Sequence, residues 1–149
     1  SSKTDAYGPL TYGDAQTSLP YCLAAAAVFG ELTPNGFSEE ALHDESVLGL
    51  AQKVHFEADA RMDQAFSKGR WPATVRVETI RGKTHEQRVD HPKGAPENPL
   101  SWAELEAKFS RLSERTLAKD GRDEITAMCK TIETLRDVRG LTASTVAVQ

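Results

Sequence analysis

The sequence predicts an α+β fold, in which a few-stranded, largely antiparallel sheet lies between helical segments. Three observations support this prediction. A helix capped at Ser18 is almost wholly apolar from Tyr21 to Phe29, and two alternating segments at 73–80 and 84–89 flank a glycine turn, as in a β-hairpin. From Trp102 onward, apolar residues recur at helical spacing. The strands therefore lie in the middle of the chain, and helices follow them.

The first helix is marked by its start, its composition and its end. Ser18 is a suitable N-cap, because its hydroxyl can accept from a free backbone N–H, and Pro20 fits a first turn that needs no N–H donor. Residues 21–29 include four consecutive alanines and no polar stripe, and Gly30 ends the segment. We expect this helix to be buried on all sides, although the chain supplies few elements to surround it.

The region between this helix and the hairpin gives weaker signals. A turn at 33–36 precedes short helical segments at 39–43 and 45–51. Apolar and polar residues alternate over 54–57, which predicts a short strand. Residues 58–70 fit no single pattern.

The C-terminal part begins with a loop. Residues 90–99 contain three prolines and a glycine, which excludes both a helix and a central strand there. The sequence from Ser101 to Glu104 forms a capping box that starts a helix. A last helix is predicted to be capped by Asp120 and ended by Gly140, and residues 141–149 are expected to form a tail.

Composition narrows the function classes. The 149 residues carry 18 Lys and Arg against 22 Asp and Glu, a net charge of −4, which disfavours a nucleic-acid-binding protein. The longest apolar run, at 22–29, is far shorter than the ~20 residues that cross a bilayer, so no membrane partner is expected. The two cysteines suggest neither a disulfide framework nor a zinc ribbon. We expect a cytoplasmic location.

Motif spacing identifies no cofactor site. The four histidines show no metal-binding pattern, and the phosphate-binding, dinucleotide and nucleophile-elbow motifs are absent from the sequence. We therefore predict no cofactor and no metal. Cys22 and Cys129 lie on apolar helix positions, where a small buried side chain is the simpler interpretation.

Tyr21 is the one candidate site residue. In the first turn of the apolar helix, a phenol can bury its ring and present its hydroxyl to a cavity as a general acid or hydrogen-bond donor. The helix N-terminus beside it favours anions such as carboxylates. The alternative is a core tyrosine that bonds a carbonyl, and from the residues alone this packing role is favoured. The 93–98 loop is open to two interpretations, a substrate lid or a rigid connector, of which we favour the connector.

Two stretches resemble motifs of the MmgE/PrpD family. Ser18 begins the sequence SLPYCLAAA, followed by Gly30, which resembles the family's SLPYxxAAxxxxG segment. Pro92 begins PKGAPENPLS, and the sequence continues to Lys108 and Phe109 in the manner of the family's PKGxPxNPLSxxELxxKF signature. The family includes 2-methylcitrate dehydratases, cis-aconitate decarboxylases and iminodisuccinate epimerases.

The resemblance implies a domain organisation. This sequence looks like the C-terminal third of family members, whose active site lies between an all-helical body and a smaller α+β lid. Residues 1–92 would form the lid-type domain, 93–100 a Pro-rich connector, and 101–140 helices that pack on a helical body outside this chain, with 141–149 as the tail. We expect either a fragment of a longer protein or a chain that works with a second polypeptide, and homodimers are possible.

The resemblance also implies chemistry. It points to cofactor-independent proton transfer next to a carboxylate of small di- and tricarboxylic acids, giving dehydration, decarboxylation or epimerisation. The tyrosine of the SLPY motif belongs to the family's site, so the resemblance implies a catalytic role for Tyr21. Tyr21→Phe is then expected to reduce turnover with little loss of stability, and the chain alone to be inactive. The alternative is a stand-alone, non-catalytic binding or interaction module that keeps the lid fold.

Overall fold

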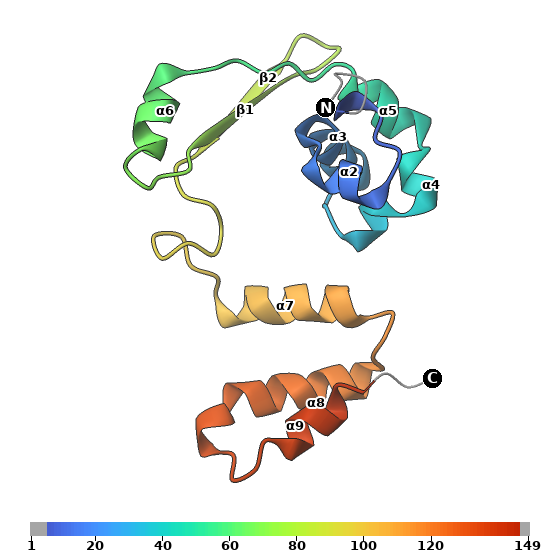
Figure 1. Cartoon of the computed structure of the whole chain (residues 1–149), viewed down its shortest axis with the longest axis vertical. Coiled ribbons are helices and arrows are strands. Elements are labelled where there is room, and N and C mark those ends of the chain that lie inside the picture. Colours follow the sequence, from blue (N-terminus) through green and yellow to red (C-terminus); the bar gives the residue numbers. More distant parts are fainter. Residues whose placement is uncertain (1–5, 147–149) are drawn as a thin grey trace. The chain divides into compact units, whose positions relative to one another are not determined.

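The structure is a computed structural model that describes residues 6–146 (Figure 1). Over these residues it contains eight α-helices and one two-stranded antiparallel sheet, which confirms the α+β prediction. The chain divides into two compact units, one from the described parts of Ser1–His55 and Glu106–Gln149 and the other from Phe56–Leu105. This division separates residues 1–55 from the hairpin, whereas the sequence analysis grouped 1–92 together.

The first unit opens with a series of short helices. Their order is α2 (Tyr12–Thr17), α3 (Leu19–Phe29), the 3₁₀ helix η1 (Pro34–Phe37), α4 (Glu39–Leu42) and α5 (Glu45–Ala51). The predicted start and end of α3 are confirmed. The Ser18 hydroxyl accepts from the Tyr21 N–H at 3.1 Å, and Gly30 takes a left-handed φ of 81°, which suits a residue without a Cβ.

The apolar core of this unit is small. α3 packs on α5, and one face of α3 is buried through Tyr21, Ala24 and Ala25. The fully or nearly buried members of the cluster are Ala15, Tyr21, Ala24, Ala25, Leu42, Val47 and Ala51. As expected from the few elements that this chain supplies, α3 is not surrounded on all sides. Leu19 is 56% exposed and Phe29 is 43% exposed, because the neighbouring helices cover only the face that carries the buried alanines.

The second unit contains α6 (Ala60–Phe66) and the strands β1 (Ala73–Glu78) and β2 (Thr84–Val89). The strands pair in antiparallel register from Ala73 opposite Val89 to Glu78 opposite Thr84, which confirms the hairpin. The strand predicted at 54–57 is wrong, because the Val54 N–H bonds the Ala51 carbonyl and closes a turn after α5. Every residue of both strands is exposed.

Three helices make up the C-terminal segment: α7 (Trp102–Ser113), α8 (Lys119–Lys130) and α9 (Arg139–Ser144), with the 3₁₀ helix η2 (Ile132–Thr134) before α9. Two predictions are corrected here. Asp120 lies in the first turn of α8 and does not cap it, because the helix starts at Lys119 with Ala118 at the N-cap position, two residues before the predicted cap.

The end of the last predicted helix is also different. α8 stops at Thr131, whose hydroxyl and N–H both bond carbonyls of the preceding turn, and Gly140 lies inside α9. Part of the predicted 141–149 tail is therefore helical, and residues 147–149 lie outside the described residues. Over residues 6–146, no helix has both the length and the apolar character that a membrane crossing requires.

Candidate functional site

Tyr21 is enclosed by the first unit. Its side chain is 0% exposed, and its hydroxyl donates a hydrogen bond to the Gly36 carbonyl at 2.8 Å. Its ring lies 6.2 Å from the Phe37 ring, measured between centroids. The structure thus gives Tyr21 the hydrogen bond that the packing alternative expected. It does not test the catalytic role, which stays a prediction.

Local sequence fixes this geometry. The Ser18 cap starts α3, so Tyr21 falls in the first turn with its ring on the buried face. The turn at Pro34 then brings η1 back over that face and presents the Gly36 carbonyl. A Cβ at Gly36 would lie in van der Waals contact with a methyl carbon of Leu32, at 3.4 Å.

The electrostatic surroundings keep the phenol protonated. Burial raises the pKa of Tyr21 above its ordinary value, and the nearby Asp44 carboxylate and Cys22 thiol raise it further. Burial likewise raises the pKa of the Cys22 thiol. At neutral pH the Tyr21 hydroxyl is therefore a proton donor, and it is poorly suited to act as a base.

The Pro-rich segment forms a tied loop. Gly94 has a φ of 97°, and its N–H bonds the Asn98 carbonyl at 2.8 Å. The Asn98 side chain donates to the His91 carbonyl at 3.0 Å. The Lys93 ammonium lies 2.8 Å from a Glu104 carboxylate oxygen. These contacts tie the loop to itself and to the start of α7, and the choice between connector and lid stays a prediction.

Glu104 closes the capping box predicted from the sequence. One of its oxygens accepts from both the N–H and the hydroxyl of Ser101, each at 2.8 Å, and the other oxygen faces Lys93. The hydrogen bonds from Lys93 and Ser101 lower the pKa of Glu104 to about 2. Sequence analysis found the box through its S-x-x-E spacing but missed the Lys93 pair and the Asn98 tie. Lys93 and Asn98 in the PKGAPEN stretch were the residues from which these two contacts could have been predicted.

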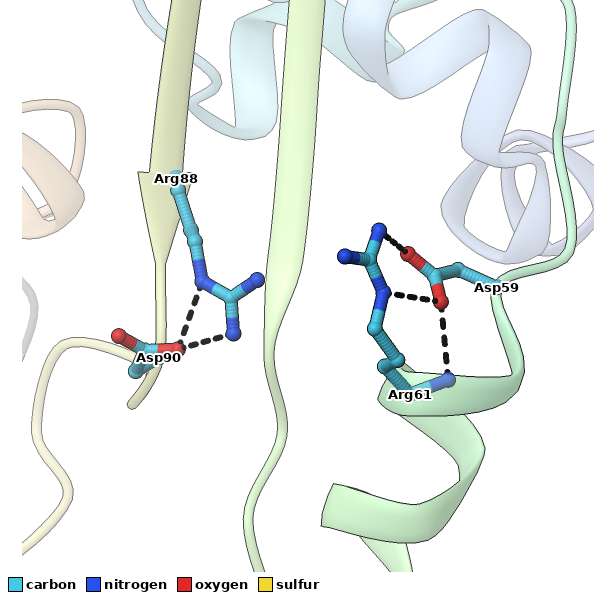
Figure 2. A network of polar contacts seen from close by, with 4 residues as sticks. All are labelled: Asp59, Arg61, Arg88 and Asp90. Carbon is cyan, nitrogen blue, oxygen red and sulfur yellow. Dashed lines mark hydrogen bonds and ion pairs between the residues drawn. The ribbon is translucent and has the colours of Figure 1, made fainter.

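Two further ion pairs of the second unit are local. Figure 2 shows the Asp59–Arg61 and Arg88–Asp90 ion pairs, with N–O distances of 2.9 and 2.6 Å. Each arginine binds an aspartate two residues away, so both charges are largely neutralised by near neighbours. These pairs involve neither Tyr21 nor any other element of the first unit.

His43 lies in the first unit with Tyr21, and His85 and His91 lie in the second. His43 bonds the Glu39 carbonyl on α4, His91 lies 3.6 Å from Glu97, and His85 lies on β2. Within residues 6–146, no three His, Cys, Asp or Glu side chains are arranged to hold a metal ion. A hollow of about 230 Å³ lies in the second unit and is lined by Met62, Asp63, Phe66, Trp71 and Pro72.

Comparison with known proteins identifies the family. The sequence model of the MmgE/PrpD C-terminal domain matches residues 2–134, which is nearly the whole chain. A search of curated proteins found no match. The matched residues include the apolar helix with Tyr21, the hairpin and the Pro-rich loop. The chain therefore belongs to the MmgE/PrpD family and corresponds to its C-terminal domain.

Proposed function

We propose that this chain is the C-terminal part of a cofactor-independent lyase or isomerase that acts on small di- or tricarboxylic acids. The reaction would be a dehydration, decarboxylation or epimerisation that moves a proton next to a substrate carboxylate. The observation that carries the proposal is the family match over residues 2–134. The SLPY segment in particular forms a capped helix with a protonated phenol in its first turn.

In this proposal Tyr21 donates a proton or a hydrogen bond to the substrate. The hydroxyl keeps its proton at neutral pH and can donate a hydrogen bond, and its raised pKa makes it a weaker acid than an ordinary tyrosine. The Gly36 carbonyl accepts the hydrogen bond of this hydroxyl, and the ring is fully buried. Catalysis therefore requires η1 to move far enough from α3 to free the hydroxyl, which gives the proposal a structural condition that can be tested.

The rest of the site would come from polypeptide outside this chain, either an N-terminal helical part or a partner chain. Exposed apolar side chains support such docking, because large apolar groups on a surface often mark contact sites. In the first unit they lie on α3 and α7 and include Leu19, Val28, Phe29 and Leu112. The chain alone is then inactive. We place the protein in the cytoplasm.

A second candidate is a stand-alone binding or interaction module that has lost the chemistry. The observation that favours it is the closed environment of Tyr21, whose hydroxyl is already satisfied by a main-chain acceptor. On this alternative the hydroxyl only stabilises the fold, as buried hydrogen-bonded groups commonly do.

The test compares Tyr21→Phe with Tyr12→Phe. Tyr12 is 48% exposed and its ring packs on Phe37, so it controls for the loss of a phenol hydroxyl near the same cluster. Both variants and the parent chain are assayed alone and together with the polypeptide that co-purifies from the native source. The substrates are 2-methylcitrate, cis-aconitate and iminodisuccinate.

We expect no turnover by any chain alone, and turnover by the parent and Tyr12→Phe in the assembled state. Removing a general acid should lower kcat of Tyr21→Phe by about 100-fold or more. An unchanged kcat would assign Tyr21 to packing, and robust turnover by the lone chain would overturn the need for a partner.

The stability of Tyr21→Phe is measured alongside by urea unfolding. The structure corrects the expectation of little loss, because Phe leaves the buried Gly36 carbonyl without its donor. We expect a decrease of about 1–2 kcal/mol in the free energy of unfolding, and within about 0.5 kcal/mol of zero for Tyr12→Phe. An equal effect of both variants would contradict the importance of the Gly36 bond.

A further inference from the structure

The hollow in the second unit is an open corner formed by two aromatic rings. The Phe66 and Trp71 rings lie 4.8 Å apart between centroids, at an interplanar angle of 82°. Phe66 is 57% exposed and Trp71 is 62% exposed, so solvent reaches both side chains. Met62 and Pro72 are half-buried and complete the apolar lining. Asp63 is the charged residue among the five that line the hollow.

The local sequence builds this corner. Met62 and Phe66 are four residues apart on α6 and therefore lie on one face, with Asp63 between them. Gly69 follows the helix with a φ of 75°, and its N–H bonds the Phe66 carbonyl at 2.9 Å. This glycine turn reverses the chain, so that Trp71 comes back against the Phe66 ring.

The Asp63 carboxylate has no cationic partner within the described part of the chain. The other two aspartates of the second unit are held by arginines, Asp59 by Arg61 and Asp90 by Arg88 (Figure 2). Over residues 6–146, Asp63 takes part in none of the ion pairs of this unit. Aromatic ring faces also carry partial negative charge, so the carboxylate and the rings attract the same kind of ligand, a cation.

The size of the hollow limits this ligand to a single functional group. Its volume of about 230 Å³ is below the roughly 300–1,000 Å³ of pockets that hold drug-sized molecules. A water molecule takes about 30 Å³ in the liquid, so the hollow holds more than a few waters. These dimensions suit the end of one side chain and exclude a whole cofactor.

We propose that this hollow binds an arginine side chain of a partner protein. A guanidinium group is a planar cation that stacks on aromatic rings and donates hydrogen bonds to a carboxylate. Phe66 and Trp71 supply the rings, and Asp63 supplies the carboxylate. The methylene groups of the arginine pack on Met62 and Pro72, as the stems of long cationic side chains do on apolar surfaces.

Other cations use fewer of these features. A lysine ammonium is a compact point charge without a plane to stack on a ring. A quaternary ammonium binds aromatic rings but has no N–H to donate to Asp63. A free guanidinium ion has no stem to cover Met62 and Pro72. An arginine that belongs to a polypeptide uses the rings, the carboxylate and the apolar lining together.

The first experiment adds Nα-acetyl-arginine amide to the full chain and follows the indole N–H signals of Trp71 and Trp102 by NMR. Trp102 is 57% exposed and lies outside the hollow, so it is an internal control of nearly equal exposure. We expect a saturable shift of the Trp71 signal alone, with a dissociation constant of about 1–10 mM, because a single side chain binds weakly. The neutral analogue Nα-acetyl-citrulline amide should bind about fivefold or more weakly, because it carries no charge.

The second experiment repeats the titration with two matched pairs of variants. Asp63→Asn removes the carboxylate, and Glu57→Gln removes an exposed charge of the same unit outside the hollow. Phe66→Leu removes a ring of the corner, and Phe56→Leu removes a ring that is 54% exposed and lies elsewhere in the unit. Asp63→Asn and Phe66→Leu should each weaken binding about threefold to fivefold, and the two control variants should leave it unchanged.

The third experiment distinguishes the possible sources of the cation. Guanidinium ion alone, at the same millimolar concentrations, should bind about fivefold or more weakly than the arginine derivative, because it lacks the stem. Equal binding of the two would assign the hollow to a free small cation and overturn the protein partner. Tighter binding of tetramethylammonium would overturn the choice of a guanidinium group.

The site itself is also open to contradiction. A Trp71 signal that does not saturate by about 50 mM of the arginine derivative would overturn the proposal, as would an equal shift of Trp102. Equal binding by Asp63→Asn and the natural sequence would contradict the role of the carboxylate. None of these readouts involves Tyr21 or turnover, so the outcome is separate from that of the proposed function.

Discussion

Glu104 is the most strongly shifted acid of the chain. Its carboxylate receives two hydrogen bonds from Ser101 and an ion pair from Lys93 at the start of α7. These contacts favour the charged form, so the pKa of Glu104 falls to about 2. The side chain is nearly half exposed, so solvent screens the interaction and its contribution to stability is modest.

We predict a pH dependence from this shift. A carboxyl group whose pKa is lower in the folded state stabilises that state above its ordinary pKa, and the stabilisation is lost as the pH falls toward the folded value. The contribution of Glu104 should therefore be complete at neutral pH and disappear between about pH 4.5 and pH 2. Glu104→Gln should remove this part of the acid sensitivity, since the amide has no charge to lose.

The measurement is a carboxyl carbon NMR titration of Glu104, repeated in a Lys93→Met variant. A midpoint near pH 2 is expected for the natural sequence. It should move upward in the variant, because the first cause of the shift is the hydrogen bond from Lys93. A midpoint at the ordinary glutamate value would contradict the capping geometry.

Tyr21 illustrates what sequence can establish about a single side chain. The helix start at Ser18 and the apolar surroundings were readable, because capping and composition are local properties. The acceptor of the hydroxyl could not be predicted. Gly36 is fifteen residues away, and it accepts through its main-chain carbonyl, a group that every residue carries. The family motif supplied the catalytic hypothesis, which the packing around the ring does not test.

At the level of elements, Gly30 and Gly49 give a matched pair of substitutions. Gly30 ends α3 with a φ of 81°, and Gly49 lies inside α5 without a positive φ. A Cβ would meet nothing within 4 Å at either position, so space is not the difference between them. Backbone conformation alone should decide the sign of each effect.

Gly30→Ala should lower the free energy of unfolding by about 1 kcal/mol, because an L side chain is strained in the left-handed region. Gly49→Ala should raise it by about 0.5–1 kcal/mol, because alanine is the better helix former. Urea unfolding of both variants checks this, and the same sign for both would contradict the assigned backbone conformations.

Helix boundaries marked by a strong local capping signal were predicted better than the other boundaries and the weak strand. The N-cap at Ser18 and the capping box at Ser101 carry explicit donors and acceptors at fixed spacing, so α3 and α7 begin where expected. α8 ends at Thr131, and threonine is not a helix-ending signal because many helices contain it. The apolar residues beyond Thr131 also keep helical spacing, so the sequence predicted a longer helix. The alternation at 54–57 failed because a turn after α5 uses the Val54 N–H.

At the level of the whole molecule, apolar burial is unevenly distributed. The buried apolar cluster lies in the helices between Ala15 and Ala51, whereas the strands of the hairpin are exposed throughout. Local opening costs least where few apolar contacts hold an element. We therefore predict that backbone protection differs strongly along the chain.

Hydrogen exchange at low protein concentration should show this difference. Amides of α3 and α5 are expected to exchange roughly 100-fold more slowly than hydrogen-bonded amides of β1 and β2. Mass spectrometry of peptides from each element provides the readout. Uniform protection along the chain would contradict the uneven core.

The Tyr21 hydroxyl is bound by a main-chain carbonyl, that of Gly36, and this limits what mutation at position 36 can change. Because every amino acid carries this group, no codon change at position 36 can delete the acceptor of the Tyr21 hydroxyl. Variation can only displace it. A methyl group there would reach van der Waals contact with Leu32 at 3.4 Å and Phe29 at 3.7 Å, so alanine fits and a larger side chain meets these two residues. Lineages with a residue larger than alanine at position 36 should therefore carry compensating replacements at positions 29 or 32, a pattern that can be sought in genomes.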